Sequence, residues 1–207
     1  MGLTVDYYFA PQSPWVYLGH ARFWTMVKES GATVRVMPVD LGGRVFPISG
    51  GLPLGQRAPQ RQAYRLLELQ RYSAYLKAPL NPRPMFFPVS GDDAARMIIA
   101  TDLQLGSHAA MQLTGAILGA VWAQERNIAD EAVLTQLLRE CGLPPDLLEQ
   151  AHSQAAQEKY ESYTQAAIDA GVFGAPSYVI DGEIFWGQDR LDFVQRKLLP
   201  AERRLQA

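Results

Sequence analysis

Segments that favour β-strands occur only near the two ends of this 207-residue chain, and a long block of helical patterns separates them. Residues 4–9 are rich in β-branched and aromatic side chains, and residues 34–39 give a second strand. Strand signals return at residues 176–180 and 184–186, with an Asp-Gly hairpin turn between them. If these segments share one sheet, the helical block must be inserted into an α/β fold.

The order of elements in each half specifies the fold more closely. After the first strand, Ser13 at the N-cap and Pro14 at the first helical position predict a helix that ends at Gly31. A last helix begins near Asp189, after the hairpin. A strand–helix–strand unit, a helical block, two strands and a helix together predict an α/β protein with a thioredoxin-like fold.

This interpretation divides the chain into two expected domains. Residues 1–41 and 172–207 form the thioredoxin-like domain, and residues 42–171 form an all-helical insertion domain. The insertion opens with a Gly- and Pro-rich stretch, residues 42–57, which is expected to be an irregular loop. Hydrophobic periodicity then predicts helices over residues 60–76, 92–105 and 107–124, another from Asp130, and a long one from Pro144 to Gly171.

Composition and charge exclude several classes of function. The formal net charge is −2, so there is no electrostatic reason to expect nucleic acid as a partner. The longest apolar run is too short to span a bilayer, and the first residues lack the features of a signal peptide. The single cysteine, Cys141, excludes an intramolecular disulfide, and the three histidines lack metal-ligand spacing. We expect a cytoplasmic protein without a metal site, which binds neither nucleic acid nor membrane.

The start of the first helix is the expected centre of chemistry. In a thioredoxin-like fold, free backbone amides and the helix dipole stabilise a thiolate at this point. Redox proteins place a Cys-x-x-Cys motif there, whereas this chain has Ser13-Pro14-Trp15-Val16. Thiol–disulfide exchange by the protein itself is therefore excluded. Ser13 is either a plain N-cap or a group that holds the thiolate of a bound thiol.

Two other segments are expected to face this corner. The Ala175-Pro176 bond occupies the position of a cis-proline, and the backbone of Ala175 can pair with an extended peptide such as glutathione. At residues 187–190, the backbone amides can bind a carboxylate and Asp189 an ammonium group, as the end of an α-amino acid requires. Asp189 as a plain N-cap, with Arg190 in solvent, is the other interpretation of that segment.

Together these residues resemble the 2-hydroxychromene-2-carboxylate isomerase family, which is related to kappa-class glutathione transferases and DsbA-like proteins. The resemblance covers nearly the whole chain and is strongest over residues 6–18, 172–177 and 185–191. It implies an isomerase of aromatic catabolism that opens a chromene acid to a benzylidenepyruvate, with glutathione as its cofactor. It also implies a homodimer.

The resemblance assigns roles to individual residues. Ser13 would orient and stabilise the glutathione thiolate. Ala175 and Pro176 would hold the peptide backbone of glutathione. Its γ-glutamyl end would be bound by Gln188, Asp189 and Arg190.

The chain departs from the family pattern where the substrate is expected to bind. Ser90 stands where an asparagine usually follows the Phe-Pro pair, and the lysine and Asn-Arg pair of the loop after residue 41 are missing. Arg44, Arg57 or Arg61 can supply the missing positive charge. The expected substrate is a small aromatic or conjugated acid. A kappa-class-like transferase or peroxidase, which consumes glutathione, and a non-catalytic glutathione-binding protein are the alternatives.

Overall fold

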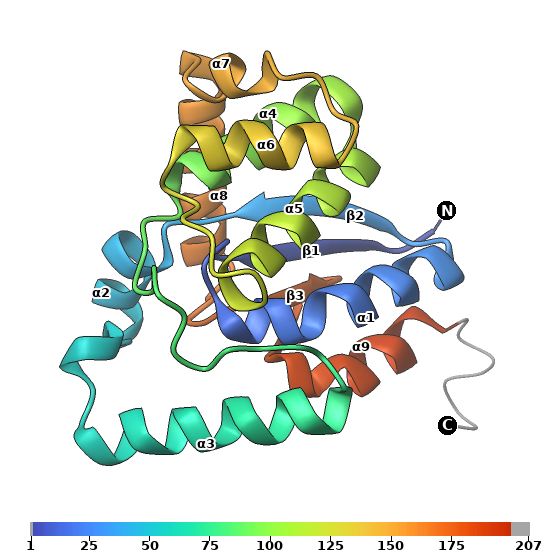
Figure 1. Ribbon diagram of the computed structural model, residues 1–207. Helices are drawn as coiled ribbons and strands as arrows, with labels where there is room; N and C mark the ends of the chain where they lie inside the picture. The colour runs from blue at the N-terminus through green and yellow to red at the C-terminus, as the bar shows by residue number, and fades with distance from the viewer. Residues whose placement is uncertain (1, 200–207) are drawn as a thin grey trace.

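A four-stranded sheet in the order β2-β1-β3-β4 forms the centre of the protein, whose computed structural model describes residues 2–199. β1 (Thr4–Phe9) pairs in parallel with β2 (Thr33–Pro38) and antiparallel with β3 (Ser177–Ile180). β4 (Glu183–Trp186) pairs antiparallel with β3 at the edge. α1 (Pro14–Ser30) connects β1 to β2 along the chain (Figure 1), and this arrangement confirms the predicted thioredoxin-like fold.

The ends of α1 follow the signals in the sequence. Ser13 has extended backbone angles, and its Oγ accepts a hydrogen bond from the Val16 amide at 3.4 Å. Pro14 is the first helical residue, where its missing N–H costs no hydrogen bond. Gly31 ends the helix with a φ of 67°, a left-handed conformation that glycine adopts without steric cost. Both predicted boundaries are confirmed.

Six helices lie between residue 58 and β3, after the shorter elements described below. Their bounds are α3 (Pro59–Leu76), α4 (Asp92–Leu105), α5 (Ser107–Trp122), α6 (Glu131–Glu140), α7 (Leu147–Ala151) and α8 (Gln154–Asp169). The expected single helix from Pro144 to Gly171 is wrong, because the chain breaks between α7 and α8. Ser153 takes extended angles there, and its Oγ accepts from the Ala156 amide at 3.2 Å, which starts a new helix.

The stretch after β2 is more regular than expected. Asp40 accepts a hydrogen bond from the Gly43 amide at 2.7 Å and starts a single π-helical turn, η1 (Leu41–Val45). A short helix, α2 (Phe46–Ser49), and a 3-10 turn, η2 (Leu54–Gln56), follow. At the other end of the chain, η3 (Gln188–Arg190) precedes α9 (Leu191–Leu198). The remaining residues of the expected C-terminal range, 200–207, lie outside the described residues.

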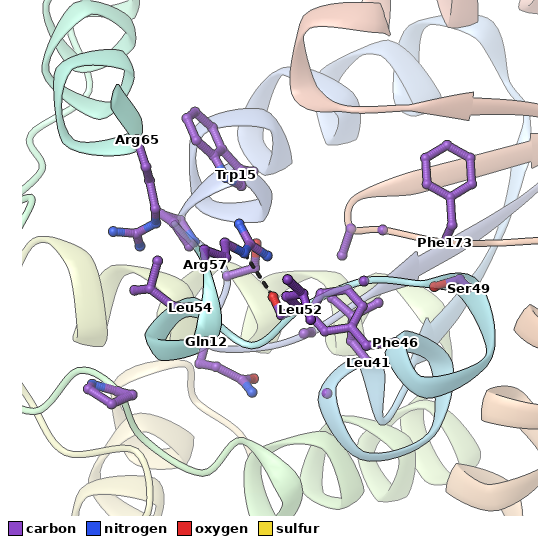
Figure 2. Close-up of a pocket in the computed structure, with 18 of the residues that line it drawn as sticks. Gln12, Trp15, Leu41, Phe46, Ser49, Leu52, Leu54, Arg57, Arg65 and Phe173 are labelled. Carbon is purple, nitrogen blue, oxygen red and sulfur yellow. Dashed lines mark hydrogen bonds between the residues drawn. The ribbon is translucent and has the colours of Figure 1, made fainter. Parts of the chain in front are cut away.

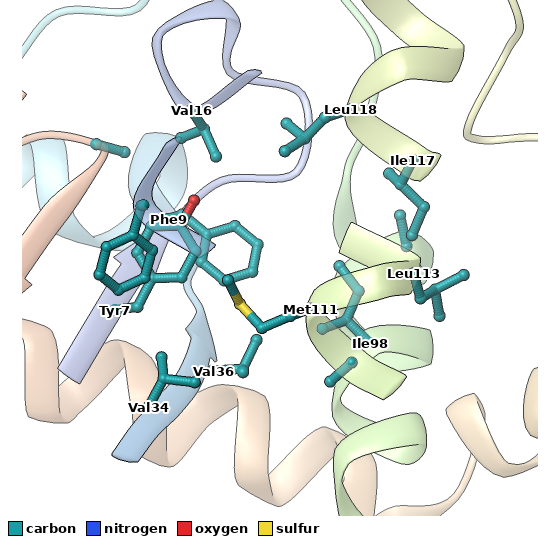
Figure 3. Packing of buried hydrophobic residues seen from close by; sticks show 14 of the residues in the cluster. Tyr7, Phe9, Val16, Val34, Val36, Ile98, Met111, Leu113, Ile117 and Leu118 are labelled. Carbon is teal, nitrogen blue, oxygen red and sulfur yellow. The ribbon is translucent and has the colours of Figure 1, made fainter. Parts of the chain in front are cut away.

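One hydrophobic core joins the sheet to the inserted helices. Tyr7 and Val36 on the sheet pack in the same cluster as Ile98 of α4 and Leu113 of α5, as Figure 3 shows. The opposite face of the sheet packs against α8, where Ala167 joins a second cluster. Because the insertion contributes to the core that covers the sheet, it fixes the position of the segments around α1. The division into two domains at the stated residues stays a prediction.

A buried histidine links α1 to α5 within this core. His20 Nε2 lies 2.9 Å from the carbonyl oxygen of Met111, and its Nδ1 lies 3.2 Å from the hydroxyl of Tyr7. Burial lowers the pKa of His20 to about 4, because a charged imidazolium loses its hydration there. His20 is therefore neutral at physiological pH and has a structural role.

Candidate active site

Two cavities lie beside the N-terminus of α1 and share part of their lining. The larger has a volume of about 650 Å³ and the smaller about 340 Å³. We refer to them as the larger and the smaller cavity, and to both together as the cleft. The residues that line both are Trp15, Arg57, Arg61, Arg65, Ala175 and Trp186. The combined space suits two small ligands that meet at the shared residues.

The Ser13 corner forms one end of the shared region. Ser13 lines the larger cavity, and Ala175 lines both. The Ala175-Pro176 bond is cis, as the sequence predicts. The amide of Gly187 donates to the carbonyl oxygen of Pro176 at 2.9 Å and so fixes the end of β4 to this loop. The structure thus brings together the helix start, the cis-proline and the segment after β4.

Residues 188–190 lie along the smaller cavity. Asp189 and Arg190 form an exposed ion pair at 2.7 Å. Gln188 is only 2% exposed, and its side-chain oxygen accepts a hydrogen bond from Arg22 of α1, which also donates to its backbone carbonyl at 2.9 Å. Gln188 therefore anchors this segment to α1, and the two charged residues beside it remain accessible to a ligand.

The four residues proposed for substrate binding separate into two pairs. Arg57 and Arg61 line both cavities. Arg44 on η1 instead donates to Gln165 on α8 at 3.3 Å, and Ser90 donates to Asp92 at 3.1 Å. Neither Arg44 nor Ser90 is among the residues that line the cleft.

Two polar residues that the sequence analysis did not identify lie in the cleft. Arg65 of α3 is 9% exposed, and its Nη2 atom is buried without a hydrogen-bond partner. Burial, with a smaller contribution from Arg57, lowers its pKa to about 10, so it stays charged at neutral pH. Gln12 lines the larger cavity, and its Oε1 is likewise buried and unpartnered. The spacing of Arg61 and Arg65, four residues apart on one helix, is the sequence signal that indicates a shared face.

Apolar and aromatic side chains complete the larger cavity. Phe173 and Trp186 stack edge to face with ring centroids 4.8 Å apart. A Cβ at Gly174 would lie 2.3 Å from Nε1 of Trp186, so glycine is required for this packing. Figure 2 shows Arg65, Arg57 and Gln12 toward one end of the view and Phe173 toward the other. An apolar cavity with guanidinium groups at one end suits an apolar ligand that carries an anionic group.

Other candidates for chemistry lie outside the cleft. Cys141 at the end of α6 is half-buried, and burial, together with the neighbouring Glu140, raises the pKa of its thiol. A raised pKa makes this thiol a poor nucleophile. Within residues 2–199 no group of three or more potential metal ligands occurs. None of the helices described there is long and apolar enough to cross a membrane.

Comparison with known proteins places this geometry in a family. The model of the DSBA-like thioredoxin domain matches residues 4–199. The chain is 28% identical over 200 residues to the 2-hydroxychromene-2-carboxylate isomerase of Sphingobium xenophagum, covering 96% of this chain and 100% of that protein. It is 30% identical over 194 residues to the isomerase of the same name from Pseudomonas sp. (strain C18), covering 91% and 87%.

Solved structures agree with this result. A 2-hydroxychromene-2-carboxylate isomerase superposes with a TM-score of 0.80 at 26% identity, covering 98% of each chain. The cytosolic disulfide reductase DsbM from Pseudomonas aeruginosa, solved with GSH, gives 0.66 at 18% identity, covering 99% of this chain and 100% of that one, and shares the fold. The chain thus belongs to the DsbA-like thioredoxin domain family and, within it, to the 2-hydroxychromene-2-carboxylate isomerases.

Proposed function

We propose that this protein is a glutathione-dependent isomerase of an aromatic or conjugated carboxylic acid. The observation that carries the proposal is the shared lining of the two cavities. It connects Asp189 and Arg190, which suit the end of an amino acid, through Ala175 to the apolar cavity that holds Ser13. A tripeptide in the smaller cavity can therefore place its thiol beside a second ligand in the larger one.

The residues of the smaller cavity fit glutathione. Asp189 accepts hydrogen bonds from the α-ammonium group of the γ-glutamyl residue, and Arg190, its ion-pair partner, binds the carboxylate. The backbone of Ala175, next to the cis peptide bond, pairs with the extended peptide. Pro176 fixes this loop, and Gln188 fixes the segment that carries Asp189, through Arg22. Arg57 or Arg61 binds the second carboxylate of the tripeptide or that of the substrate.

Ser13 and the start of α1 provide the electrostatics of the reaction. A free thiol has a pKa of about 8.5 and is mostly protonated at neutral pH. The Ser13 hydroxyl donates a hydrogen bond to the thiolate, and the helix dipole favours the negative charge at the same point. Bound glutathione supplies the nucleophile that adds reversibly to a conjugated double bond. The apolar wall around Phe173 and Trp186 keeps the ring of the substrate in place and excludes water.

Calorimetric titration with reduced glutathione tests the cofactor. We expect saturable binding by the wild type. In Ser13→Ala we expect a raised pKa of the bound thiol and a rate of chromene-acid isomerisation lower by roughly 100-fold, as for loss of one donor to a developing anion. Ser153→Ala is the matched control, because Ser153 also caps a helix but lies outside the cleft lining. Absence of binding at millimolar glutathione would contradict the proposal.

The glutathione concentration during turnover separates the alternatives. An isomerase returns glutathione unchanged, whereas a kappa-class-like transferase or peroxidase consumes one or more molecules for each product. Equal activity of Ser13→Ala and the wild type on every electrophile would instead favour a binding protein. A cytoplasmic location, where reduced glutathione is available, belongs to the same proposal, and the homodimer stays a prediction from family resemblance.

A further inference from the structure

Three guanidinium groups around the cleft have no counter-ion. Within residues 2–199, Arg57, Arg61 and Arg65 form no ion pair with an acidic side chain. The nearest acid on the same helix, Glu68, is paired with Arg71 at 2.8 Å. Arg61 is exposed and Arg57 is half-exposed, so water can solvate both. Arg65 has little access to water, and its charge requires another explanation.

Two aromatic rings account for part of the stability of the buried charge. The guanidinium carbon of Arg65 lies 5.2 Å from the ring centre of Phe87 and 5.7 Å from that of Trp122. Cation–π contacts of this kind stabilise the charge through the ring faces. They do not use the N–H groups in the plane of the guanidinium, and Nη2 is buried without an acceptor. A buried charged donor without an acceptor costs free energy that a ligand can recover.

The surroundings indicate which cavity holds that ligand. Phe87, which lies against Arg65, lines only the larger cavity. The two acidic residues of the cleft lining, Glu68 and Asp189, line only the smaller cavity, so an anion in the larger cavity meets no carboxylate of the protein. The larger cavity is otherwise apolar apart from Gln12, Ser13, Ser49 and the arginines. An anion on an apolar ligand therefore meets Arg65 most favourably from the larger cavity.

We propose that Arg65 is a specificity-determining residue of this protein, whose guanidinium group binds the carboxylate of the substrate in the larger cavity. The inference rests on the proposed function in assigning that cavity to the substrate. It adds a residue that selects for an acid over a neutral compound of the same shape. A planar guanidinium donates two parallel hydrogen bonds to a carboxylate, which a lysine in the same position cannot reproduce.

Binding of a model acid tests this role without turnover. 2-Naphthoate and its neutral analogue 2-naphthamide are titrated, without glutathione, against wild type, Arg65→Met and the control Arg139→Met. Arg139 is an exposed helical arginine outside the cleft lining, so its loss changes net charge equally. In Arg65→Met we expect the naphthoate Kd to rise at least about tenfold and the naphthamide Kd to stay within about twofold. The control should match wild type for both ligands.

Several results would overturn the inference. Equal naphthoate affinity of Arg65→Met and wild type would do so, and an equal loss for both ligands would show that Arg65 only maintains the cavity. Arg65→Gln, which is neutral but still polar, provides the same comparison where the methionine variant fails to fold. A weaker affinity of either variant for glutathione would assign Arg65 to the cofactor. Failure of the wild type to bind glutathione would contradict the proposed function alone, because the naphthoate titrations do not contain it.

Discussion

The two walls of the cleft recognise ligands in different ways. The first wall consists of the start of α1, the loop at residues 172–176 and the segment at residues 186–190, all from the sheet half of the chain. It offers backbone groups, a cis peptide bond and a helix N-terminus, together with the Ser13 hydroxyl, the Asp189–Arg190 pair and the rings of Phe173 and Trp186. The second wall, residues 46–65, offers arginine and apolar side chains. Backbone recognition depends on fold, so the first wall suits a constant cofactor, whereas the second can change with the substrate.

The largest predicted effect concerns His20, which joins the helix of the first wall to α5. The folded pKa of about 4 lies below the unfolded value of 6.5, so the unfolded chain binds more protons between these pH values. The stabilisation is complete above pH 6.5 and is lost as the pH falls toward 4. A difference of one between the folded and the unfolded pKa corresponds to ~1.4 kcal/mol, so we expect the free energy of unfolding to fall by about 3 kcal/mol. Urea unfolding at several pH values measures it.

The variant His20→Gln should remove most of this pH dependence. Its amide can still donate to the carbonyl oxygen of Met111. Tyr7→Phe is the control, because it removes the hydrogen bond between the Tyr7 hydroxyl and Nδ1 of His20 and keeps the titrating imidazole. The same pH dependence in His20→Gln and wild type would contradict the assignment.

The next effect concerns the contact between α1 and the segment after β4. In Gly19→Ala, the new Cβ would lie 2.9 Å from Cβ of Gln188 and 3.1 Å from the hydroxyl of Tyr178. Both neighbours are buried, so we expect a loss of roughly 1–2 kcal/mol in stability and weaker glutathione binding. Thermal unfolding and calorimetry measure these two quantities.

Gly119→Ala is the matched control for this substitution. Gly119 also lies within a helix, and its Cβ would have no atom within 4 Å. There we expect a gain of about 0.5–1 kcal/mol from helix propensity. Equal effects at Gly19 and Gly119 would show that the first wall tolerates displacement of Gln188.

A smaller effect is expected for Asp189→Asn. Loss of the carboxylate should weaken glutathione binding by roughly tenfold, because a charge-assisted hydrogen bond to the ammonium group is removed. Asp192→Asn, an exposed neighbour at the start of α9, should bind glutathione like wild type. Calorimetric Kd values of the two variants for glutathione test this prediction. Equal values would show that Asp189 does not belong to the proposed cofactor site.

The smallest effect concerns the residues that the structure places away from the cleft lining. Arg44→Ala and Ser90→Ala should each leave kcat/KM within about twofold of wild type, as expected for surface changes away from the site. Steady-state kinetics with a chromene acid measures this. A tenfold or larger loss of kcat/KM in either variant would show that the second wall includes η1 or the loop before α4. The contrast between the two walls would then be weaker.

The sequence predicts the first wall better than the second for a physical reason. Ser13, Pro14 and Gly31 act through neighbouring backbone groups, so their effect on α1 can be read locally. The position of Arg65 depends instead on how α3 packs against Phe87 and Trp122, residues far along the chain. Because of the turns at η1 and η2, the sequence likewise does not predict which of the arginines lines the cleft. The break between α7 and α8 can be predicted from the sequence in principle, because Ser153 is an N-cap signal within a long helical pattern.

The absence of cysteine at the start of α1 has a consequence for chemical damage to the protein and for control of its activity. The only sulfhydryl of the chain, Cys141, is half-buried with a raised pKa and lies outside the cleft lining. Oxidants and alkylating reagents therefore find no thiolate of the protein to inactivate at the reaction centre. Under the proposed function, all reactive sulfur would come from a diffusible tripeptide, so ligand exchange would replace a damaged thiol and turnover would follow the redox state of the glutathione pool.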